Sequence, residues 1–449
     1  MQNNDSANRL RDLAVLAARR IQEAGFTAYW AGGCVRDTLM GLPPKDYDIA
    51  TDATPERVME LFPGSVPVGK AFAVVKAPLE EAWFEVAAFR RDDTYADGRH
   101  PVSVSPAEPE VDARRRDFTI NAMFYDPVKD RLHDYAGGKN DLDRRVVRAV
   151  GQPEQRFRED HLRMMRAVRF ATSLDFKLDT DTAAAIRRSA HLITRISPER
   201  VRGELTRTLM EAVKPGYAVR MLDDLGILEP VLPELIPMKG QVQPERFHPE
   251  GDVFVHTVLM LNMMKQRTVH LVYAVLFHDV GKPATAKLAD GRMRFDGHAS
   301  AGAEMTASIM RRLRFPAADV KAVSRCVHDH MRFMDVQKMK TSTLRRMVGS
   351  DTFPTELELH RLDCLASHGD LSNYGFLEDF QEKLSKEKPL PEPWVTGRDI
   401  MSFGVPEGPA VGKWRTIAYN AQLEEKFPDR ESLLEWLEAE IERTISGKN

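Results

Sequence analysis

The stretch 31-AGGCVRDTLMGLPPKDYDI-49 sets the expectations for the N-terminal region. Its glycine pair, Gly32 and Gly33, follows a short apolar segment typical of a strand and opens a short helix, which a glycine and two prolines stop. Asp46 and Asp48 then lie two residues apart at the start of the next expected strand. Successive side chains on a strand point to opposite faces, so these two carboxylates share one face.

This combination of residues predicts a metal-dependent triphosphate site. Two carboxylates on one face repel each other unless a cation lies between them. Mg²⁺ prefers oxygen ligands and often completes its shell with phosphates, and two such ions can activate a hydroxyl and stabilise a leaving pyrophosphate. Glycines let backbone N–H groups approach phosphates, and Arg36 adds a fixed charge. Glu85, in the alternating segment FEVAAF, is the candidate third carboxylate. The alternative is that Asp46 and Asp48 are only turn residues.

Composition indicates an ordinary globular protein. The chain has 449 residues, of which 43% are hydrophobic and 29% charged, and this length predicts two to four domains. No apolar stretch approaches the roughly 20 residues of a membrane helix, and the polar N-terminus lacks a secretory apolar region. Three widely spaced cysteines argue against a disulfide framework and fit a reducing compartment. We therefore expect a cytoplasmic protein with no membrane partner.

Charge is distributed unevenly along the chain. The formal net charge is −3, but residues 114–169 hold twelve arginines and two lysines against nine acids, a local excess of five positive charges. Such a segment indicates either a phosphate-rich partner or a solvated helical face, and charge alone does not decide between them.

Periodicity predicts an α/β region followed by helical regions. Residues 1–150 alternate between strand and helix patterns, and the segments TAYWA, YDIAT and FEVAAF are expected strands. Residues 151–245 are predominantly helical in pattern and end in a proline-rich stretch typical of a linker or a domain boundary. A second helical block is expected over 246–385, and a small helical segment over 386–449.

Several motifs in residues 25–230 resemble a known family. In order, GGCVRDTLMG with KDYDI, RRDFTINAMFYD, REDHLRMMRAVRFA and SPERVRGEL resemble the motifs of the class II tRNA nucleotidyltransferase/poly(A) polymerase family. The resemblance implies a polymerase-beta-type α/β palm as a nucleotidyltransferase head, followed by an all-α neck and body. It implies that Asp46 and Asp48 hold catalytic Mg²⁺ and that the glycine turn and Arg36 contact the triphosphate. The remaining nucleotide-binding residues that it implies are Arg116, Asp117, Asp160, Arg163, Arg166 and Arg169.

The segment EDHLR suggests how such a protein selects bases. Asp160 and Arg163 are three residues apart, so on a helix they share a face. A carboxylate only accepts hydrogen bonds and a guanidinium only donates them. Cytosine and adenine each present an amino donor beside a ring-nitrogen acceptor, whereas uracil and guanine present the opposite order. The pair would match C and A, and each mismatch should cost about 1–3 kcal/mol. The alternative is a plain intrahelical salt bridge.

Two further segments bear on the product. The long polar connection between Glu85 and Arg115 is typical of a lid or a disordered loop. In the family, a flexible loop here remodels the pocket as addition turns from C to A, which favours full CCA addition. Tail-adding relatives carry two adjacent basic residues where this chain has Lys70 and Ala71, which favours the tRNA enzyme.

A second constellation lies between residues 248 and 363. Imidazoles and carboxylates on separate helices can converge on one metal, and a metal-bound water is a potential nucleophile. The motif HDVGKP and its flanking histidines resemble the HD phosphohydrolase superfamily. The resemblance implies a divalent transition metal such as Mn²⁺, Ni²⁺ or Fe²⁺. The alternative is an HD fold kept for structure or for tRNA contact. The implied ligands are His256, His278, Asp279 and Asp363, with His298 and His330 as further ligands or phosphate contacts.

The sequence thus predicts template-independent addition of CMP and AMP, from CTP and ATP, to the 3′ end of tRNA. The basic stretch and the body would hold the tRNA acceptor arm through its backbone and shape. One alternative is a poly(A) polymerase or an A-adding partial enzyme. Others are an HD phosphohydrolase with an RNA-binding head and a pure RNA-binding scaffold. The HD substrate and the oligomeric state stay open.

Overall fold

The computed structural model describes residues 2–68, 74–92, 104–244, 251–289, 291–384, 388–445 and 447. It divides into two compact units. The first contains Met1–Pro237 with Arg312–Phe315, and the second contains Met238–Arg311 with Pro316–Asn449. The regions predicted as head and helical neck therefore fall together in the first unit, and the HD region and C-terminal segment fall in the second.

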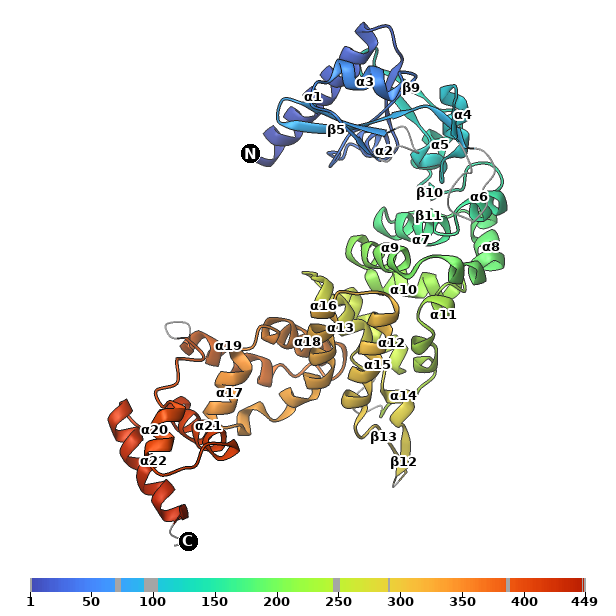
Figure 1. The fold of residues 1–449 in the computed structure, drawn as a ribbon. Helices are drawn as coiled ribbons and strands as arrows, with labels where there is room; N and C mark the ends of the chain where they lie inside the picture. The colour runs from blue at the N-terminus through green and yellow to red at the C-terminus, as the bar shows by residue number, and fades with distance from the viewer. Residues whose placement is uncertain are drawn as a thin grey trace. The chain divides into compact units, whose positions relative to one another are not determined.

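A mixed sheet forms the N-terminal part of the first unit (Figure 1). In the described residues it has seven strands in the order β3-β4-β5-β2-β1-β8-β9. Neighbouring strands are antiparallel except β2 and β5, which are parallel. The strands predicted from TAYWA, YDIAT and FEVAAF are confirmed as β1, β2 and β5. The seven strands are β1 (Ala28–Ala31), β2 (Asp48–Thr51), β3 (Val66–Val68), β4 (Val74–Leu79), β5 (Ala82–Ala88), β8 (Phe124–Asp126) and β9 (Arg131–His133).

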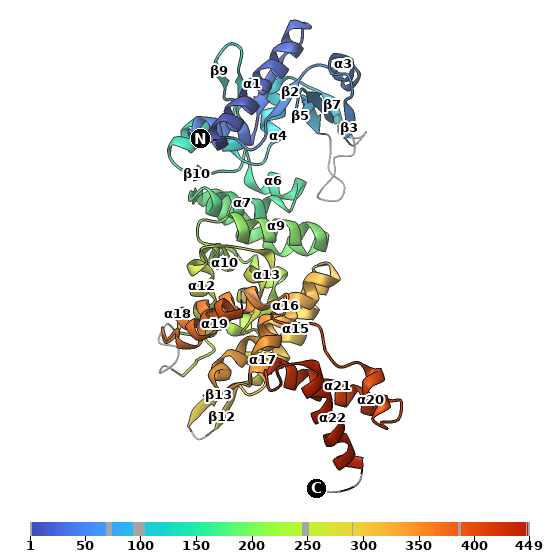
Figure 2. The same cartoon turned by 90° about the vertical axis from the view of Figure 1, so that its left-hand side faces the viewer.

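Strand alternation gives the sheet a covered and an open face. On β5 the buried Phe84 and Val86 flank the exposed Glu85, the pattern of a strand with one face on the core. Helices α1 (Gln2–Glu23) and α3 (Pro55–Leu61) pack against the sheet (Figures 1 and 2). The polar side chains of β2 and β5 are thereby left on the opposite side.

Short helices connect and follow the sheet within the first unit. The predicted helical character of residues 153–228 is confirmed, but the chain leaves the helix at Asp160, whose φ of −143° and ψ of 107° are extended. The helices are α2 (Gly33–Leu39), α4 (Pro109–Arg115), η1 (Thr119–Asn121), α5 (Gly138–Asp143), α6 (Pro153–Glu159), α7 (Arg163–Ser173), α8 (Thr180–Ser189), η2 (Ala190–Arg195), α9 (Pro198–Glu211) and α10 (Pro215–Asp224). Two small strand pairs are β6 (Arg90–Asp92) with β7 (Val104–Pro106) and β10 (Val146–Val147) with β11 (Lys177–Leu178).

The proline-rich stretch, predicted as a linker or a domain boundary, contains the boundary between the two units at Pro237 and Met238, but part of it is helical and packed rather than a simple linker. It forms α11 (Leu228–Val231) and η3 (Pro233–Met238), and Leu232 and Leu235 are buried. Proline is tolerated in the first turn of a helix, where its missing N–H has no partner. Apolar residues between the prolines therefore still reach the core.

Helices dominate the second unit (Figure 1), as predicted, with one exception. A β-hairpin of β12 (Lys287–Ala289) and β13 (Arg292–Arg294) interrupts the predicted helical block. In the described residues of this unit, the other elements are α12 (Val253–Met263), α13 (Val269–Phe277), α14 (Lys282–Thr285), α15 (His298–Arg312), α16 (Ala317–Asp329), η4 (His330–Lys338), α17 (Thr341–Val348), α18 (Phe353–Ala366), α19 (Ser372–Lys383), α20 (Gly397–Ser402), α21 (Pro409–Leu423) and α22 (Arg430–Ile445). None of the described helices combines the length and apolar composition that crossing a bilayer requires.

Some predictions fall on residues outside the described ranges. Lys70 and Ala71, which bear on tail addition, lie there, and so do residues 93–103 of the long connection predicted between Glu85 and Arg115. In its described part that connection is not a loop, because it forms the end of β5, the pair β6 and β7, and α4.

Candidate active site and metal centre

The glycine turn is built for close approach. Gly32 has a φ of 75°, a left-handed conformation that other residues adopt only at a cost. A Cβ at this position would lie 3.2 Å from the Nη1 of Arg116. Gly33 then begins α2. Glycine is therefore required here both by the backbone conformation and by the guanidinium beside it.

Three carboxylates, here called the head carboxylates, gather beside this turn: Asp46, Asp48 and Glu85. Asp48 on β2 lies directly opposite Glu85 on the parallel strand β5, which confirms the prediction that Glu85 is on a neighbouring strand. Tyr47 is buried between the two exposed aspartates, so both point to the open side. Desolvation and the charges of Asp46 and Glu85 raise the pKa of Asp48 to about 6.

This crowding of negative charge fits a divalent cation. A carboxylate whose pKa is raised by like charges is relieved when a cation binds among them. Carboxylate oxygens are also the protein ligands that Mg²⁺ takes. The three side chains present therefore suit the predicted metal site.

A cavity of about 470 Å³, here called the first-unit cavity, joins the head to the helices that follow it. It brings together most of the predicted nucleotide-binding residues. It is lined by Gly32, Gly33, Arg36, Asp48, Arg115, Arg116, Asp117, Asn121, Asp160, Leu162, Arg163, Arg166, Phe170 and Arg200.

Buried carboxylates hold the arginines of this cavity in place. Asp112 is 1% exposed and pairs with Arg115 and with Arg116, at 2.5 and 3.0 Å. Burial alone would raise the pKa of Asp112, but the charges of Arg116 and Arg115 lower it below its usual value. Asp117 pairs with Arg166 at 2.7 Å. Its burial likewise opposes ionisation, and the charge of Arg166 outweighs that effect and lowers its pKa.

An asparagine links this network to the glycine turn. Asn121 accepts a hydrogen bond from the Nη1 of Arg36 at 2.9 Å and donates to Asp117 at 3.4 Å. Arg36 also pairs with Asp37 at 2.6 Å and lies over the ring of Phe170, 5.4 Å from its centroid. Hydrogen bonds and a ring contact thus link Arg36, which is expected to bind phosphate, to residues of the helices that follow the sheet, all within the first unit.

The predicted arrangement of Asp160 and Arg163 is wrong. They do not share a helix face, because Asp160 ends α6 in an extended conformation and Arg163 begins α7. Asp160 pairs instead with Arg200 at 2.8 Å, and Arg163 pairs with Glu159 at 2.6 Å. Both residues still line the first-unit cavity, so the break brings them there by a turn rather than by helical spacing.

Arg169 does not line the cavity, although it was predicted to bind nucleotide. It is 8% exposed and pairs with Glu204 at 2.5 Å and with Glu211 at 3.3 Å, both on α9. Through these two ion pairs Arg169 links α7 to α9. Asp46 and Glu85 are likewise absent from the cavity lining and approach it only through Asp48.

Sequence analysis did not single out five residues of the cavity wall. All five stood inside quoted motifs: Arg115 and Asn121 in RRDFTINAMFYD, Leu162 and Phe170 in REDHLRMMRAVRFA, and Arg200 in SPERVRGEL. A polar residue inside a recognised motif was the available signal, but its partners lie up to 85 residues away in the chain.

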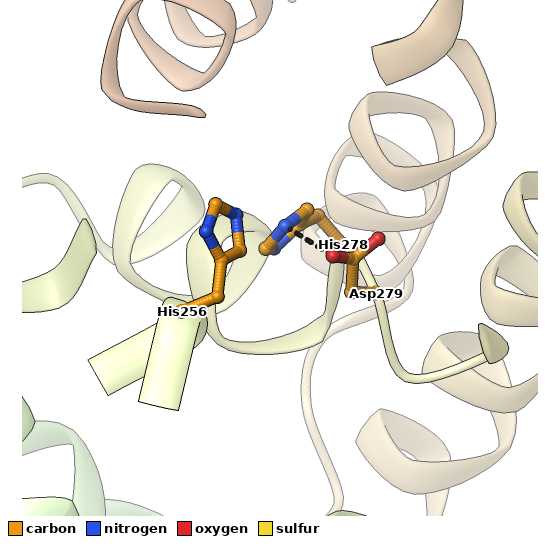
Figure 3. A group of neighbouring side chains, drawn as sticks. All are labelled: His256, His278 and Asp279. Atoms are coloured by element: carbon orange, nitrogen blue, oxygen red, sulfur yellow. Dashed lines mark ion pairs between the residues drawn. The ribbon is translucent and has the colours of Figure 1, made fainter. Parts of the chain in front are cut away.

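The second unit brings all six residues of the other constellation together, as predicted. This group, here called the histidine–aspartate cluster, comprises His256, His278, Asp279, His298, His330 and Asp363. Figure 3 shows His256 and His278 side by side, with His278 directed at Asp279. The measured pairs are His256–Asp363 at 3.1 Å, His278–Asp279 at 3.0 Å, His298–Asp279 at 3.6 Å and His330–Asp279 at 3.9 Å.

Backbone carbonyls fix three of the imidazoles. The Nδ1 atoms of His278, His298 and His330 lie 2.9, 2.8 and 2.6 Å from the carbonyl oxygens of Val275, Phe295 and Val327. A carbonyl only accepts, so each Nδ1 is the donor, and each Nε2 is left facing the cluster. Metal-binding histidines are oriented by the same kind of hydrogen bond.

Two of these Nε2 atoms lie close together inside the cluster. The Nε2 atoms of His298 and His330 are 3.2 Å apart. Burial lowers the pKa of both groups, that of His330 to about 4. The buried Nε2 of His278 makes no hydrogen bond of good geometry. Inward lone pairs beside a buried carboxylate are the donor set that a divalent transition metal takes.

A cavity of about 360 Å³ opens beside the cluster. Several residues that line this cavity were not among the predicted site residues. Lys282, within the quoted motif HDVGKP, pairs with Asp279 at 2.7 Å. The others include Met293, Arg294, Met331, Met334, His360 and His368.

Three family models match the chain and define its class. The poly A polymerase head domain matches residues 28–148 and the probable RNA and SrmB-binding site of polymerase A matches 175–239. The HD domain matches 253–365. The chain therefore combines a nucleotidyltransferase head with an RNA-binding region and an HD domain.

Individual relatives show which family within this class the chain belongs to. The A-adding tRNA nucleotidyltransferase of Deinococcus radiodurans is 36% identical over 408 residues, which is 85% of this chain and 88% of that protein. The CCA-adding enzyme of Ligilactobacillus salivarius is 45% identical over 192 residues, 42% of this chain and 47% of that protein. Such matches to CCA-adding enzymes span about half the length of those relatives. The chain belongs to the class II tRNA nucleotidyltransferase, or CCA-adding enzyme/poly(A) polymerase, family.

Solved structures agree in fold. The Bacillus stearothermophilus CCA-adding enzyme in complex with CTP has a TM-score of 0.77 at 26% identity, covering 98% of this chain and 99% of that chain. The Thermotoga maritima CCA-adding enzyme complexed with tRNA has a TM-score of 0.61 at 19% identity, covering 96% and 95%. An α/β head followed by helical regions and an HD domain is thus the established architecture.

Proposed function

We propose that this protein adds CMP and AMP, from CTP and ATP, to the 3′ end of tRNA without a nucleic-acid template. One observation carries the proposal: Asp48, the glycine turn and the Asp160–Arg163 segment line a single cavity. The carboxylate expected at the reacting phosphate and the groups expected to select the base therefore face one bound nucleotide. The names of relatives that act on tRNA support the same substrate class.

The head carboxylates and the glycine turn would hold the triphosphate. Asp46 and Asp48 would hold Mg²⁺, with Glu85 beside them. When bound, the divalent ions would stabilise charge that develops on the phosphates. Backbone N–H groups at Gly32 and Gly33 and the guanidinium of Arg36 would orient the phosphate chain. Arg116 and Asp117 would contact ribose and phosphate.

Asp160 and Arg163 would select the base, and Arg166 would support them from the next turn of α7. Asp160 supplies acceptors and Arg163 donors, which match the pairing edges of C and A. Uracil or guanine would leave buried groups unpaired, at a cost of about 1–3 kcal/mol for each mismatch. The tRNA acceptor arm would be held by the basic segment that follows the head.

Incorporation from each single nucleotide tests this proposal. Transcripts of one tRNA ending before each of the three terminal positions would be supplied separately with CTP, ATP, UTP or GTP. We expect CMP on the two shorter transcripts and AMP on the longest, with UTP and GTP rejected. Runs of A on any RNA, with no use of CTP, would contradict it.

An A-adding enzyme is the second candidate. The observation that favours it is the match to the A-adding enzyme of Deinococcus radiodurans over 85% of this chain. The same assay separates the two functions, because an A-adding enzyme would extend only the transcript that already ends in CC.

We also propose that the histidine–aspartate cluster binds a divalent transition metal, such as Mn²⁺, Ni²⁺ or Fe²⁺, and hydrolyses phosphoesters. Inward Nε2 lone pairs beside Asp279 support the metal, and Lys282 beside the adjoining cavity would attract a phosphate. A bound metal would supply an activated water. Release of the alcohol from a generic phosphodiester, and of inorganic phosphate from a generic phosphomonoester, by the full chain with each metal added in turn tests this activity. No turnover with any of these metals would leave a structural role and contradict it.

A further inference from the structure

Asp160 is held by a residue from another helix. Its Oδ2 accepts a hydrogen bond from the Nη2 of Arg200 at 2.8 Å, and its Oδ1 accepts one from the backbone N–H of Leu162 at 3.0 Å. Arg200 stands in the first turn of α9, 40 residues further along the chain. The two side chains are 20% and 23% exposed. Each oxygen of the carboxylate therefore has one fixed partner.

Arg163 does not perform this task. Its Nη1 donates to Glu159 at 2.6 Å and to the carbonyl of Arg156 at 3.1 Å, and its Nη2 donates to the carbonyl of Arg115 at 2.9 Å. The two groups expected to face the base are thus held separately. Arg163 is held by residues of α6 and α4, and the side chain of Asp160 by Arg200 on α9.

Asp160 needs such a partner because it lies in a break between helices. In the extended conformation at this residue, the Leu162 N–H fixes only one oxygen and leaves the plane of the carboxylate free to turn. A second, charge-assisted hydrogen bond on the other oxygen fixes that plane. One lone pair on each oxygen stays available to accept from a base amino group.

We infer that Arg200 is a positioning residue for base selection, which orients Asp160 toward the amino group of cytosine or adenine. This inference rests on the proposed role of Asp160 and Arg163. Arg200 also lines the first-unit cavity, so a direct contact with the triphosphate is the competing role. The two roles differ in their effect: a triphosphate contact serves every nucleotide equally, whereas orientation of Asp160 affects the discrimination between bases.

The test is a double-mutant cycle read as nucleotide discrimination. Full-length wild type, Arg200→Ala, Asp160→Ala and the double variant would each be assayed for kcat/KM with CTP and UTP on a tRNA transcript that lacks its last three nucleotides. We expect Arg200→Ala to lower the CTP/UTP ratio roughly tenfold, the loss typical of one hydrogen bond to a charged group. We expect no further loss when Arg200→Ala is added to Asp160→Ala, because Arg200 acts through that carboxylate.

Two additional variants control the experiment. Arg207→Ala removes a half-exposed arginine from the same helix and should leave the CTP/UTP ratio unchanged. Arg200→Lys keeps the charge but loses the planar guanidinium, so its ratio should fall between wild type and Arg200→Ala. If Arg200→Ala does not fold, Arg200→Lys with and without Asp160→Ala provides the same cycle.

Four results would overturn the inference. An equal fall in kcat/KM for both nucleotides would assign Arg200 to the triphosphate. A fall in the ratio that persists fully in the Asp160→Ala background would mean that Arg200 acts independently. Wild-type discrimination in Asp160→Ala itself would refute the proposed base selection as well, whereas a loss there with an unchanged Arg200→Ala refutes only the positioning role.

Discussion

The two sites differ in how their side chains are held in place. In the first-unit cavity, ion pairs with carboxylates orient the arginines. In the histidine–aspartate cluster, hydrogen bonds to backbone carbonyls orient the imidazoles. Asp112 and Asp117 are buried beneath the cavity and ionised by the arginines that they orient. The carbonyls behind His278, His298 and His330 are neutral and leave lone pairs directed inward. The cavity thus carries positive charge toward an anionic ligand, whereas the cluster offers electron pairs toward a cation.

This difference predicts that each site can lose its activity without affecting the activity of the other. A variant that removes ligands from one unit should leave the other unit's activity intact, because each network closes within its own unit. The following experiments test that separation, beginning with the largest expected effect.

Asp46→Ala combined with Asp48→Ala should lower nucleotide incorporation by at least 10²–10³-fold, roughly the loss seen when stabilisation of developing charge is removed. Single-turnover addition of CMP to a tRNA transcript measures it. The metal content of the second unit should match wild type. Retained incorporation would mean that the head carboxylates do not carry the reaction.

His278→Ala combined with Asp279→Ala should abolish tight metal binding by the histidine–aspartate cluster, since it removes a ligand pair that the other residues surround. Elemental analysis of the purified full chain measures bound metal. His270→Ala, at a histidine that pairs with Asp319, is the matched control and should keep the metal. Wild-type metal content in the double variant would contradict the site, and CMP addition should be unaffected in either case.

Glu204→Gln should destabilise the first unit by about 3 kcal/mol, because it leaves the buried guanidinium of Arg169 with a weakened partner. Glu204 is fully buried and Arg169 nearly so. Urea unfolding followed by a probe in the first unit measures the change. Glu199→Gln makes the same change at an exposed position of the same helix and should change stability by less than about 0.5 kcal/mol. A shift as small as that control in Glu204→Gln would show that the pair contributes little.

Acid should destabilise the first unit in part through the buried carboxylates of the cavity network. The pKa of Asp112 is lowered below its usual value of 3.8. Its ionisation therefore contributes stability that is present above pH 3.8 and is lost as the pH falls through the lower, folded-state pKa. Asp112→Asn should flatten the fall in urea midpoint below pH 4. An identical pH profile for the variant and wild type would contradict the contribution.

Local pattern was enough to predict much of the head. Strand patterns predicted that Asp48 and Glu85 lie on neighbouring strands, and the register of β2 and β5 confirms it. The prediction that Asp46 lies on the same strand as Asp48 is wrong, because β2 begins at Asp48. Helical periodicity failed at Asp160, where the sequence EDHLR carries no glycine or proline to mark a break. The extended conformation there is stabilised by Arg200 from a distant helix, a contact that no window of neighbouring residues contains.

The sequence by itself determined the family motifs and the strands that carry Asp48 and Glu85, because these depend on residue type and short-range spacing. The members of the histidine–aspartate cluster followed from the resemblance to the HD superfamily, since they lie on separate helices far apart in the chain. Tertiary structure alone decided which partner each charged group takes. It assigned Arg200 to Asp160, Asn121 to Arg36 and Glu204 to Arg169. Ion pairs and hydrogen bonds act only over a few ångströms, so packing of residues distant in the chain selects among the many partners that composition allows.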